Sequence, residues 1–253
     1  MSFGKPDAAC MDLSCIKIIT METLPFYISI LFMLTTFITI YFFWKASLSK
    51  TALIVIVLWL VLQTLISLTG FYKVIDTVPP RLALLILPPV ILIAGLFLTV
   101  GGRDFLDHLD IKWLTVLHIV RIPVELVLFT LFVHKLVPGI MTFEGRNLDI
   151  ISGITAPVVY YFGFVKNKIN RTVLIAWNVL CLILLVNIVT IAVLSAPFAF
   201  QRFGFDQPNI AILSFPFVWL PCCVVPLVLF SHLASLRKLL TRQTRTLHSA
   251  SLA

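Results

Sequence analysis

The chain has 253 residues, of which 60% are hydrophobic and 12% are charged, and its mean hydropathy is +1.08. Soluble domains carry about 25% charged residues, so this composition excludes an ordinary soluble domain. The formal net charge of +8 does not indicate nucleic-acid binding, because the basic residues lie at the ends of apolar blocks, where they direct membrane topology.

The apolar residues form seven blocks, each of a length suited to crossing a hydrocarbon core of about 30 Å. Backbone polar groups in that core find no water, so each block is expected to be a helix. The blocks are residues 24–44, 51–71, 82–100, 113–137, 150–165, 172–199 and 210–232. The sequence therefore predicts an all-α, polytopic integral membrane protein with a seven-helix transmembrane bundle.

Three regions follow from these blocks. Residues 1–23 form an external N-terminal tail, residues 24–232 the membrane domain and residues 233–253 a basic cytoplasmic tail. In that tail, Leu233, Leu236 and Leu240 recur at helical spacing between basic residues, which predicts a short amphipathic helix on the anionic lipids of the inner leaflet. A frayed tail whose charges only direct topology is the alternative.

The lysine and arginine residues outside the blocks indicate the orientation. With the N-terminus outside, the inner segments hold eleven of them and the outer segments seven, which favours an external N-terminus and a cytoplasmic C-terminus. The inner residues are Lys45, Lys50, Arg103, Lys112, Lys166, Lys168, Arg171, Arg237, Lys238, Arg242 and Arg245; the outer ones are Lys5, Lys17, Lys73, Arg81, Lys135, Arg146 and Arg202. A plasma membrane or a bacterial inner membrane is the expected location.

The fourth block contains the sequence HIVRIPVE, residues 118–125, which places ionisable groups where each is costly. At about 100° per residue, His118, Arg121 and Glu125 share one helix face, and this face is expected to turn away from lipid. Pro123 removes a backbone donor and should kink the helix between the arginine and the glutamate.

These residues predict a site for substrate binding or proton relay. Arg121 would hold an anionic group, Glu125 would gain or lose a proton as its pair with Arg121 breaks or forms, and His118 would relay protons. The structural alternative is a buried Arg–Glu pair that only fixes helix packing. A bundle held by apolar packing gains little from two desolvated charges, which favours the functional interpretation.

Residues 139–153 are a second candidate, a loop gate. Glu144, Arg146, Asn147 and Asp149 lie here between three glycines, directly after the charged block. Glycine hinges and mixed charge suit a loop that dips into the bundle and closes over a ligand. The alternative is an ordinary connector in which Asn147 or Asp149 caps the fifth helix.

No cofactor or metal ion is predicted, and two weaker patterns stay open. Asp104, Asp107 and His108 would offer three metal ligands on one helix face, but a solvated interfacial helix is the simpler interpretation. Cys10 and Cys15 would form either an external disulfide or two free thiols, because their spacing does not choose between these states.

Polar and proline residues in the other blocks have structural interpretations. Gln63 and Asn178 are expected to hydrogen-bond between helices. Prolines recur every five residues in the last block, at Pro216, Pro221 and Pro226, which predicts a bent and movable helix.

The favoured function is passage of a small anionic solute, coupled to protons through Glu125 and His118. The first alternative is an intramembrane enzyme for a lipid or other hydrophobic substrate, with His118 and Glu125 as acid and base and Arg121 as a clamp. The second is a sensor that transmits through its basic tail.

Overall fold

The computed structural model describes residues 24–251, with side chains up to Thr241. The predicted external tail, with Cys10 and Cys15, lies outside the described residues. Within the described range the chain is all-helical and contains no strand. The helices are α2 (Phe26–Ser47), α3 (Lys50–Leu68), α4 (Ala83–Leu98), α5 (Val100–His108), α6 (Ile111–Leu117), α7 (Arg121–Val133), α8 (Ile150–Tyr160), α9 (Arg171–Leu194) and α10 (Val225–Ser251).

Among the described residues, five helices are long and apolar enough to cross a membrane: Phe26–Ser47, Lys50–Leu68, Ile111–Val133, Arg171–Leu194 and Leu220–Thr241. A sixth apolar segment, α4, meets α5 at a bend of 92°, and a seventh, Ile150–Val165, is shorter. Each of the seven predicted blocks thus contains a helix. The long apolar helices are those of a helical membrane protein. Five of the helices reach the length of a span individually.

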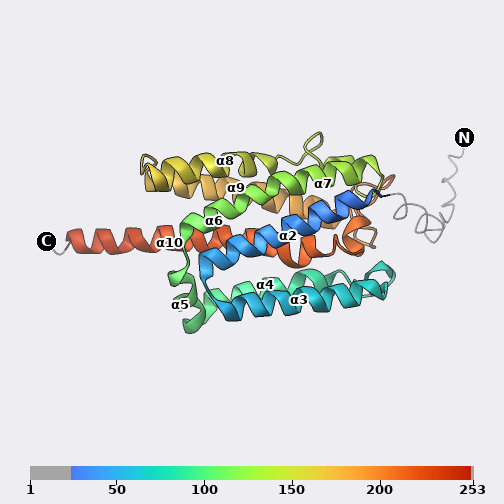
Figure 1. Ribbon diagram of the computed structural model, residues 1–253, viewed down its shortest axis with the longest axis horizontal. Helices are drawn as coiled ribbons and strands as arrows, with labels where there is room; N and C mark the ends of the chain where they lie inside the picture. The colour runs from blue at the N-terminus through green and yellow to red at the C-terminus, as the bar shows by residue number, and fades with distance from the viewer. Residues whose placement is uncertain (1–23, 252–253) are drawn as a thin grey trace, which may run out of the picture.

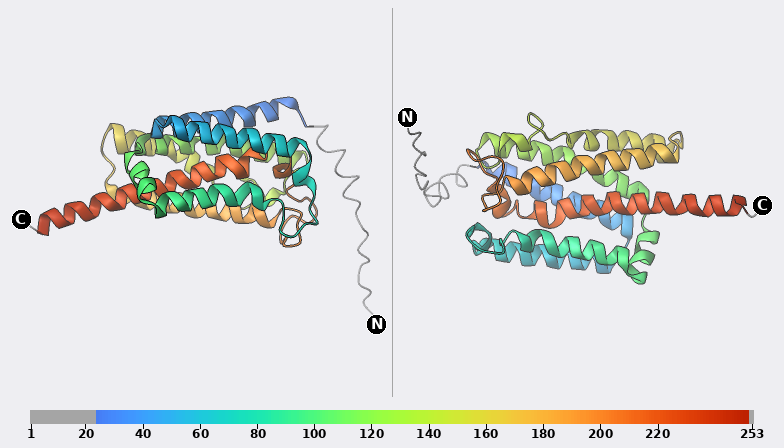
Figure 2. Two further views of the ribbon diagram at one scale, coloured as in Figure 1. Left: turned by 90° about the horizontal axis from the view of Figure 1, so that it is seen from below. Right: turned by 180° about the vertical axis from the view of Figure 1, so that it is seen from behind.

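The helices form a bundle with α10 at its centre (Figures 1 and 2). The pair α3 and α4 lies at one edge and the pair α8 and α9 at the opposite edge, with α2 and the α6–α7 segment between them (Figure 1). Leu220–Thr241 is the most enclosed of the long helices, because 61% of the residues in its most apolar stretch are buried. In Lys50–Leu68 the corresponding share is only 17%. The outer face of α3 therefore suits contact with lipid.

Polar caps begin the helices at the end of the bundle where α2 meets α3. The Ser49 hydroxyl accepts a hydrogen bond from the Ala52 amide at 3.2 Å, Asp110 accepts from Lys112 at 2.9 Å and Asn170 accepts from Val173 at 2.9 Å. These side chains satisfy amides that the first turn of a helix leaves without an intrahelical partner. The linkers before α3, α6 and α9 each end in such a cap.

At the opposite end, a buried tyrosine closes the connection between α3 and α4. Tyr72 is fully buried in a 3-10 turn, Phe71–Lys73, and donates a hydrogen bond to Gln63. Burial raises the pKa of Tyr72 to about 12, so its hydroxyl remains a donor at neutral pH. Gln63 therefore bonds to the turn that follows its own helix, and not to another helix as the sequence predicts.

The last predicted block, 210–232, differs most from its expected form. Residues 211–213 form a 3-10 turn, residues 220–224 a π turn, and the α-helix starts only at Val225. Prolines at 216 and 221 lack the amide that a regular helix would need, which delays its start. The helix then runs without a break to Ser251, so the predicted boundary at residue 232 falls inside one helix.

The fourth block is also interrupted, although not where the sequence predicts. A 3-10 turn at His118–Val120 separates α6 from α7, and Arg121 and Glu125 then lie on the same regular helix. The α-helix is therefore interrupted one turn before Pro123, and it is regular between Arg121 and Glu125, where the sequence predicts a kink.

Candidate functional site

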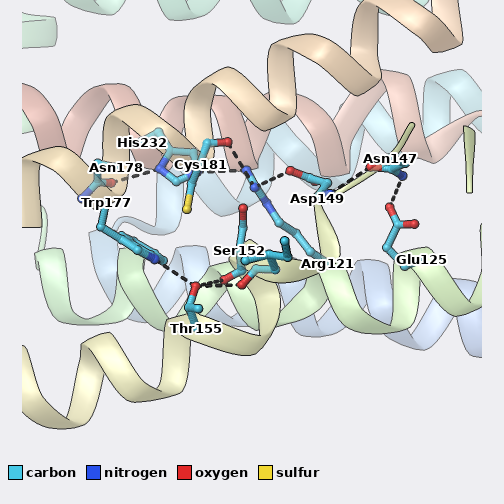
Figure 3. Close-up of polar contacts among 11 residues, drawn as sticks. Arg121, Glu125, Asn147, Asp149, Ser152, Thr155, Trp177, Asn178, Cys181 and His232 are labelled. Carbon is cyan, nitrogen blue, oxygen red and sulfur yellow. Dashed lines mark hydrogen bonds and ion pairs between the residues drawn. The ribbon is translucent and has the colours of Figure 1, made fainter. Parts of the chain in front are cut away.

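The three ionisable side chains of the fourth block all face the interior of the bundle. His118 is fully buried, Arg121 is 3% exposed and Glu125 is 2% exposed. Charged groups at this depth are expected to avoid lipid and to find partners inside the protein. Their partners come from α8, α9, α10 and the loop that precedes α8 (Figure 3).

Arg121 contacts three different segments. Its Nη1 donates to the Asp149 carboxylate at 2.6 Å and to the Cys181 carbonyl at 3.3 Å, while its Nη2 lies 2.9 Å from Nε2 of His232. The guanidinium thereby joins α7 to the start of α8, to α9 and to α10 (Figure 3). One side chain holds four segments of the bundle together.

The contacts of His232 determine its protonation. A guanidinium only donates hydrogen bonds, so Nε2 of His232 must accept from Arg121. The proton of the neutral ring then lies on Nδ1, which is 3.0 Å from the Asn178 amide oxygen and donates to it. The Asn178 amide nitrogen in turn donates to the Leu174 carbonyl at 2.9 Å. Each donor in this series meets an acceptor only if His232 is neutral.

Glu125 bonds to the loop and not to Arg121. Asn147 donates to the Glu125 carboxylate and, at 2.9 Å, to the Met141 carbonyl, while its side-chain oxygen accepts from the Asp149 amide at 3.0 Å. The prediction that Arg121 pairs with Glu125 is therefore wrong. The loop runs antiparallel to α7, so Asn147 reaches Glu125 and Asp149 reaches Arg121 one turn away.

The four predicted gate residues divide into two pairs. Asn147 and Asp149 are buried against the charged helix, whereas Glu144 and Arg146 are exposed. Asp149 precedes the first residue of α8, but its side chain makes no capping bond there. Its carboxylate binds Arg121 instead of the helix amides, which excludes the capping role for Asp149.

The start of α8 lies deep within the bundle. Arg121 is near the middle of the 23-residue helix Ile111–Val133, so it lies about 15 Å from the first residue of that helix. Asp149 contacts Arg121, so α8 begins beside the middle of the Ile111–Val133 helix. The positive end of the helix dipole lies next to the guanidinium.

A glycine permits this close approach of α8 to α7. A Cβ atom on Gly153 would lie 2.8 Å from Cγ1 of Ile122 and 3.3 Å from Cβ of Arg121. Any larger residue here would push the start of α8 away from the arginine.

Three ring contacts among His118, Trp177 and His232 complete the site. The His118 ring stacks on His232 with centroids 3.8 Å apart, and the Trp177 ring lies edge-on to both. Trp177 donates its indole proton to the Thr155 hydroxyl at 2.9 Å, which connects α9 to α8.

Several buried polar atoms of the site have no partner among the described residues. They are both ring nitrogens of His118, Nε of Arg121 and one carboxylate oxygen of Glu125. Buried polar groups are normally hydrogen-bonded, so these atoms are the part of the network that the described side chains leave unsatisfied.

The candidate metal ligands do not converge. Asp107 lies 3.3 Å from Arg237, and His108 lies 3.7 Å from Asp104 on an exposed face of α5. Within the described part of the chain, no group of three His, Cys, Asp or Glu side chains is placed to hold a metal ion. The solvated interfacial helix is the interpretation that fits α5.

Two residues of the network, His232 and Asn178, are not among the functional residues that the sequence predicts. His232 was the last residue of the predicted seventh block, whereas it lies near the middle of Leu220–Thr241. A histidine inside an apolar helix is the signal that would have identified it, but the irregular start of α10 concealed its depth.

Fold and site together define a helical membrane protein with a buried network of ionisable and polar side chains. The chain belongs to a family described as a domain of unknown function (DUF8737), whose profile matches residues 78–240. This range contains α4 to α9, most of α10 and the complete polar network. Comparisons with curated proteins and with solved structures found no match.

Proposed function

We propose that the protein carries a small anion across the membrane, that Arg121 binds the anion, and that proton binding by the buried histidines is coupled to this step. The proposal includes seven membrane-crossing segments with the N-terminus outside and the C-terminus in the cytoplasm of a plasma or bacterial inner membrane.

Two observations support the topology. The first residues of α2 and the last residues of α10 lie at opposite ends of the bundle (Figure 1), which requires an odd number of crossings. The end from which α10 projects also carries most of the basic residues, including Lys50, Lys166 and Arg237, as expected of a cytoplasmic face. The basic end of α10 would then meet the anionic lipids of the inner leaflet.

The observation that carries the transport proposal is the identity of the partner of Arg121. Its carboxylate partner, Asp149, belongs to a connecting loop and not to another long helix. A loop can move while the helices keep their packing, and an anion could then replace the Asp149 carboxylate at the guanidinium. Transporters use the same combination, in which the start of a discontinuous helix near the membrane centre faces an anionic substrate.

Proton coupling rests on the contact between Arg121 and His232. A proton on Nε2 of His232 would place a donor against the guanidinium, and the two groups could not keep their hydrogen bond. The other groups that face His232 are His118, Trp177 and Asn178. Protonation of His232 would therefore break the hydrogen bond between His232 and Arg121. The contacts that hold Arg121 against Asp149 would be weakened as a result.

The enzyme alternative has less support. A cavity of about 610 Å³ does lie among apolar helices, but no acidic, basic or histidine side chain lines it. It is formed mainly by α3, α4 and α10, whereas the polar network lies among α7, α8, α9 and α10. A substrate in that cavity would not reach the acid and base that the sequence suggested.

A flux assay tests the proposal. Purified protein in liposomes is compared with protein-free liposomes for uptake of chloride, acetate and inorganic phosphate. We expect uptake of at least one anion, loss of that uptake in Arg121→Gln, and retained uptake in Arg202→Gln, an exposed arginine outside the network. Equal uptake by Arg121→Gln and the parent would overturn the proposal, as would no uptake of any of the three anions. Thermal unfolding of each variant in detergent separates loss of binding from loss of fold.

A further inference from the structure

A cavity of about 610 Å³ between α3, α4 and α10 has no part in the proposed transport. Its walls are apolar and include Trp59, Ile93, Leu227 and Phe230. This volume lies in the range of about 300 to 1,000 Å³ that is typical of binding sites for small molecules. The cavity suits a ligand that is uncharged over most of the ligand's own length.

Two tryptophans hold α3 at a distance that leaves this space open. Trp59 donates its indole proton to the Cys222 carbonyl at 3.0 Å, and Trp219 donates to the Thr64 hydroxyl at 2.9 Å. The Cys222 carbonyl is available because Pro226, four residues later, has no amide to bond it. α3 is therefore fixed to the bundle by side-chain hydrogen bonds and packs little against α4.

The cavity opens toward lipid. Val55, Leu58 and Leu92 line it and are 47%, 63% and 55% exposed. These residues lie on the lipid-facing sides of α3 and α4, so a molecule in the bilayer can enter between the two helices without crossing an aqueous face.

The length of the cavity matches one leaflet. Along α3 its lining runs from Thr51 to Leu62, a distance of about 17 Å for that number of helical residues. Half of a hydrocarbon core is about 15 Å thick. A single acyl chain that starts at the membrane surface would therefore fill the cavity to the centre of the bilayer.

Two basic residues belong to the segments that form the surface end of the cavity. Lys50 is the first residue of α3, next to Ser49 and Thr51 of the lining, and Arg103 lies on α5, whose Phe105 also lines the cavity. Neither basic side chain forms an ion pair with another described residue. The acidic neighbours on α5, Asp104 and Asp107, face His108 and Arg237. This arrangement favours a negatively charged head group.

We infer that the cavity binds one acyl chain of an anionic phospholipid, drawn from the leaflet on the side of the α2–α3 turn. The lipid phosphate would lie near Lys50 and Arg103, and its chain would lie between α3 and α4 against Trp59. The bound lipid would complete the packing that α3 lacks in the protein alone.

Native mass spectrometry of the detergent-purified protein tests this inference. Phosphatidylglycerol and phosphatidylcholine with identical acyl chains are titrated against the parent, Leu92→Trp, which adds bulk at the opening of the cavity, and Leu126→Trp, a matched control on a lipid-facing part of α7 that is 49% exposed. We expect Leu92→Trp to weaken phosphatidylglycerol binding about tenfold and Leu126→Trp to leave it unchanged. Lys50→Gln should reduce the preference for phosphatidylglycerol over phosphatidylcholine.

The position of the lipid is measured independently by cross-linking. Phosphatidylglycerol with a photoreactive acyl chain should label α3 and α4 peptides that line the cavity, and excess unlabelled phosphatidylglycerol should compete. Labels spread evenly over the lipid-facing helices, equal affinities of the two tryptophan variants, or equal binding of the two lipids would each overturn the inference.

Discussion

The imidazole rings of His118 and His232 stack with an interplanar angle of 12°, although 114 positions along the chain separate the two residues. The contact joins the break between α6 and α7 to the first third of α10, near the middle of the Leu220–Thr241 segment. The His232 ring also accepts a hydrogen bond from Arg121 and donates one to Asn178. One side chain therefore makes both the ring stacking and two of the buried hydrogen bonds.

The hydrogen bonds of His232 predict a difference between two substitutions. Glutamine offers an acceptor and a donor, so His232→Gln can keep both hydrogen bonds. His232→Leu removes both, which leaves a buried donor of Arg121 and the buried amide oxygen of Asn178 without a hydrogen-bond partner. Each such loss costs about 1 to 3 kcal/mol. Thermal unfolding in detergent should therefore show a clearly lower midpoint for His232→Leu than for His232→Gln. Equal midpoints would contradict the assigned contacts.

The same contacts predict the tautomer of His232. At neutral pH the ring should be neutral with its proton on Nδ1, because Nε2 accepts from the guanidinium. Nitrogen-15 solid-state NMR of protein labelled at histidine should show this tautomer, with the signal assigned by its absence in His232→Gln. A doubly protonated ring, or a proton on Nε2, would exclude the bond to Arg121.

The buried Arg121–Asp149 pair predicts non-additive effects on stability. Removing one partner leaves a buried charge without its counterion and costs about 3 to 5 kcal/mol, whereas removing both avoids this penalty. Arg121→Met with Asp149→Leu should therefore be more stable than either single variant. The free energy of unfolding of all four proteins completes the cycle, and additive losses would show that the pair is not coupled.

The sequence predicted the apolar helices well and the polar contacts poorly, for a physical reason. Water exclusion alone requires helices in the apolar blocks, so α2, α3 and α9 begin within two residues of their predicted starts. The partner of Arg121 depends on the path of the loop before α8, which no local pattern determines. The depth of His232 depends on how far the prolines delay α10, and the spacing of those prolines predicts distortion but not its extent.

The packing of α8 on α7 predicts opposite effects for two glycines. Gly153→Ala would place a methyl group against Ile122 at the start of α8, whereas a Cβ atom on Gly95, inside α4, has no heavy atom within 4 Å. Alanine is favoured over glycine in a helix by about 0.5 to 1 kcal/mol. We expect Gly153→Ala to lower the unfolding midpoint and the anion flux, and Gly95→Ala to maintain or raise the midpoint. A tolerated alanine at 153 would show that α8 does not need this close approach.

Proton coupling predicts how flux responds to a pH gradient. In the parent, acidification on one side should protonate His232 there, release Arg121 and accelerate uptake of the transported anion from that side. His232→Gln keeps the hydrogen bonds but cannot take up the proton, so it should transport at a rate that the gradient no longer changes. His108→Gln, an exposed histidine on α5, serves as the matched control and should respond like the parent. If His232→Gln keeps the full response to the gradient, the proton acts at another residue, and Glu125, which retains an unpaired buried oxygen, becomes the group to substitute next.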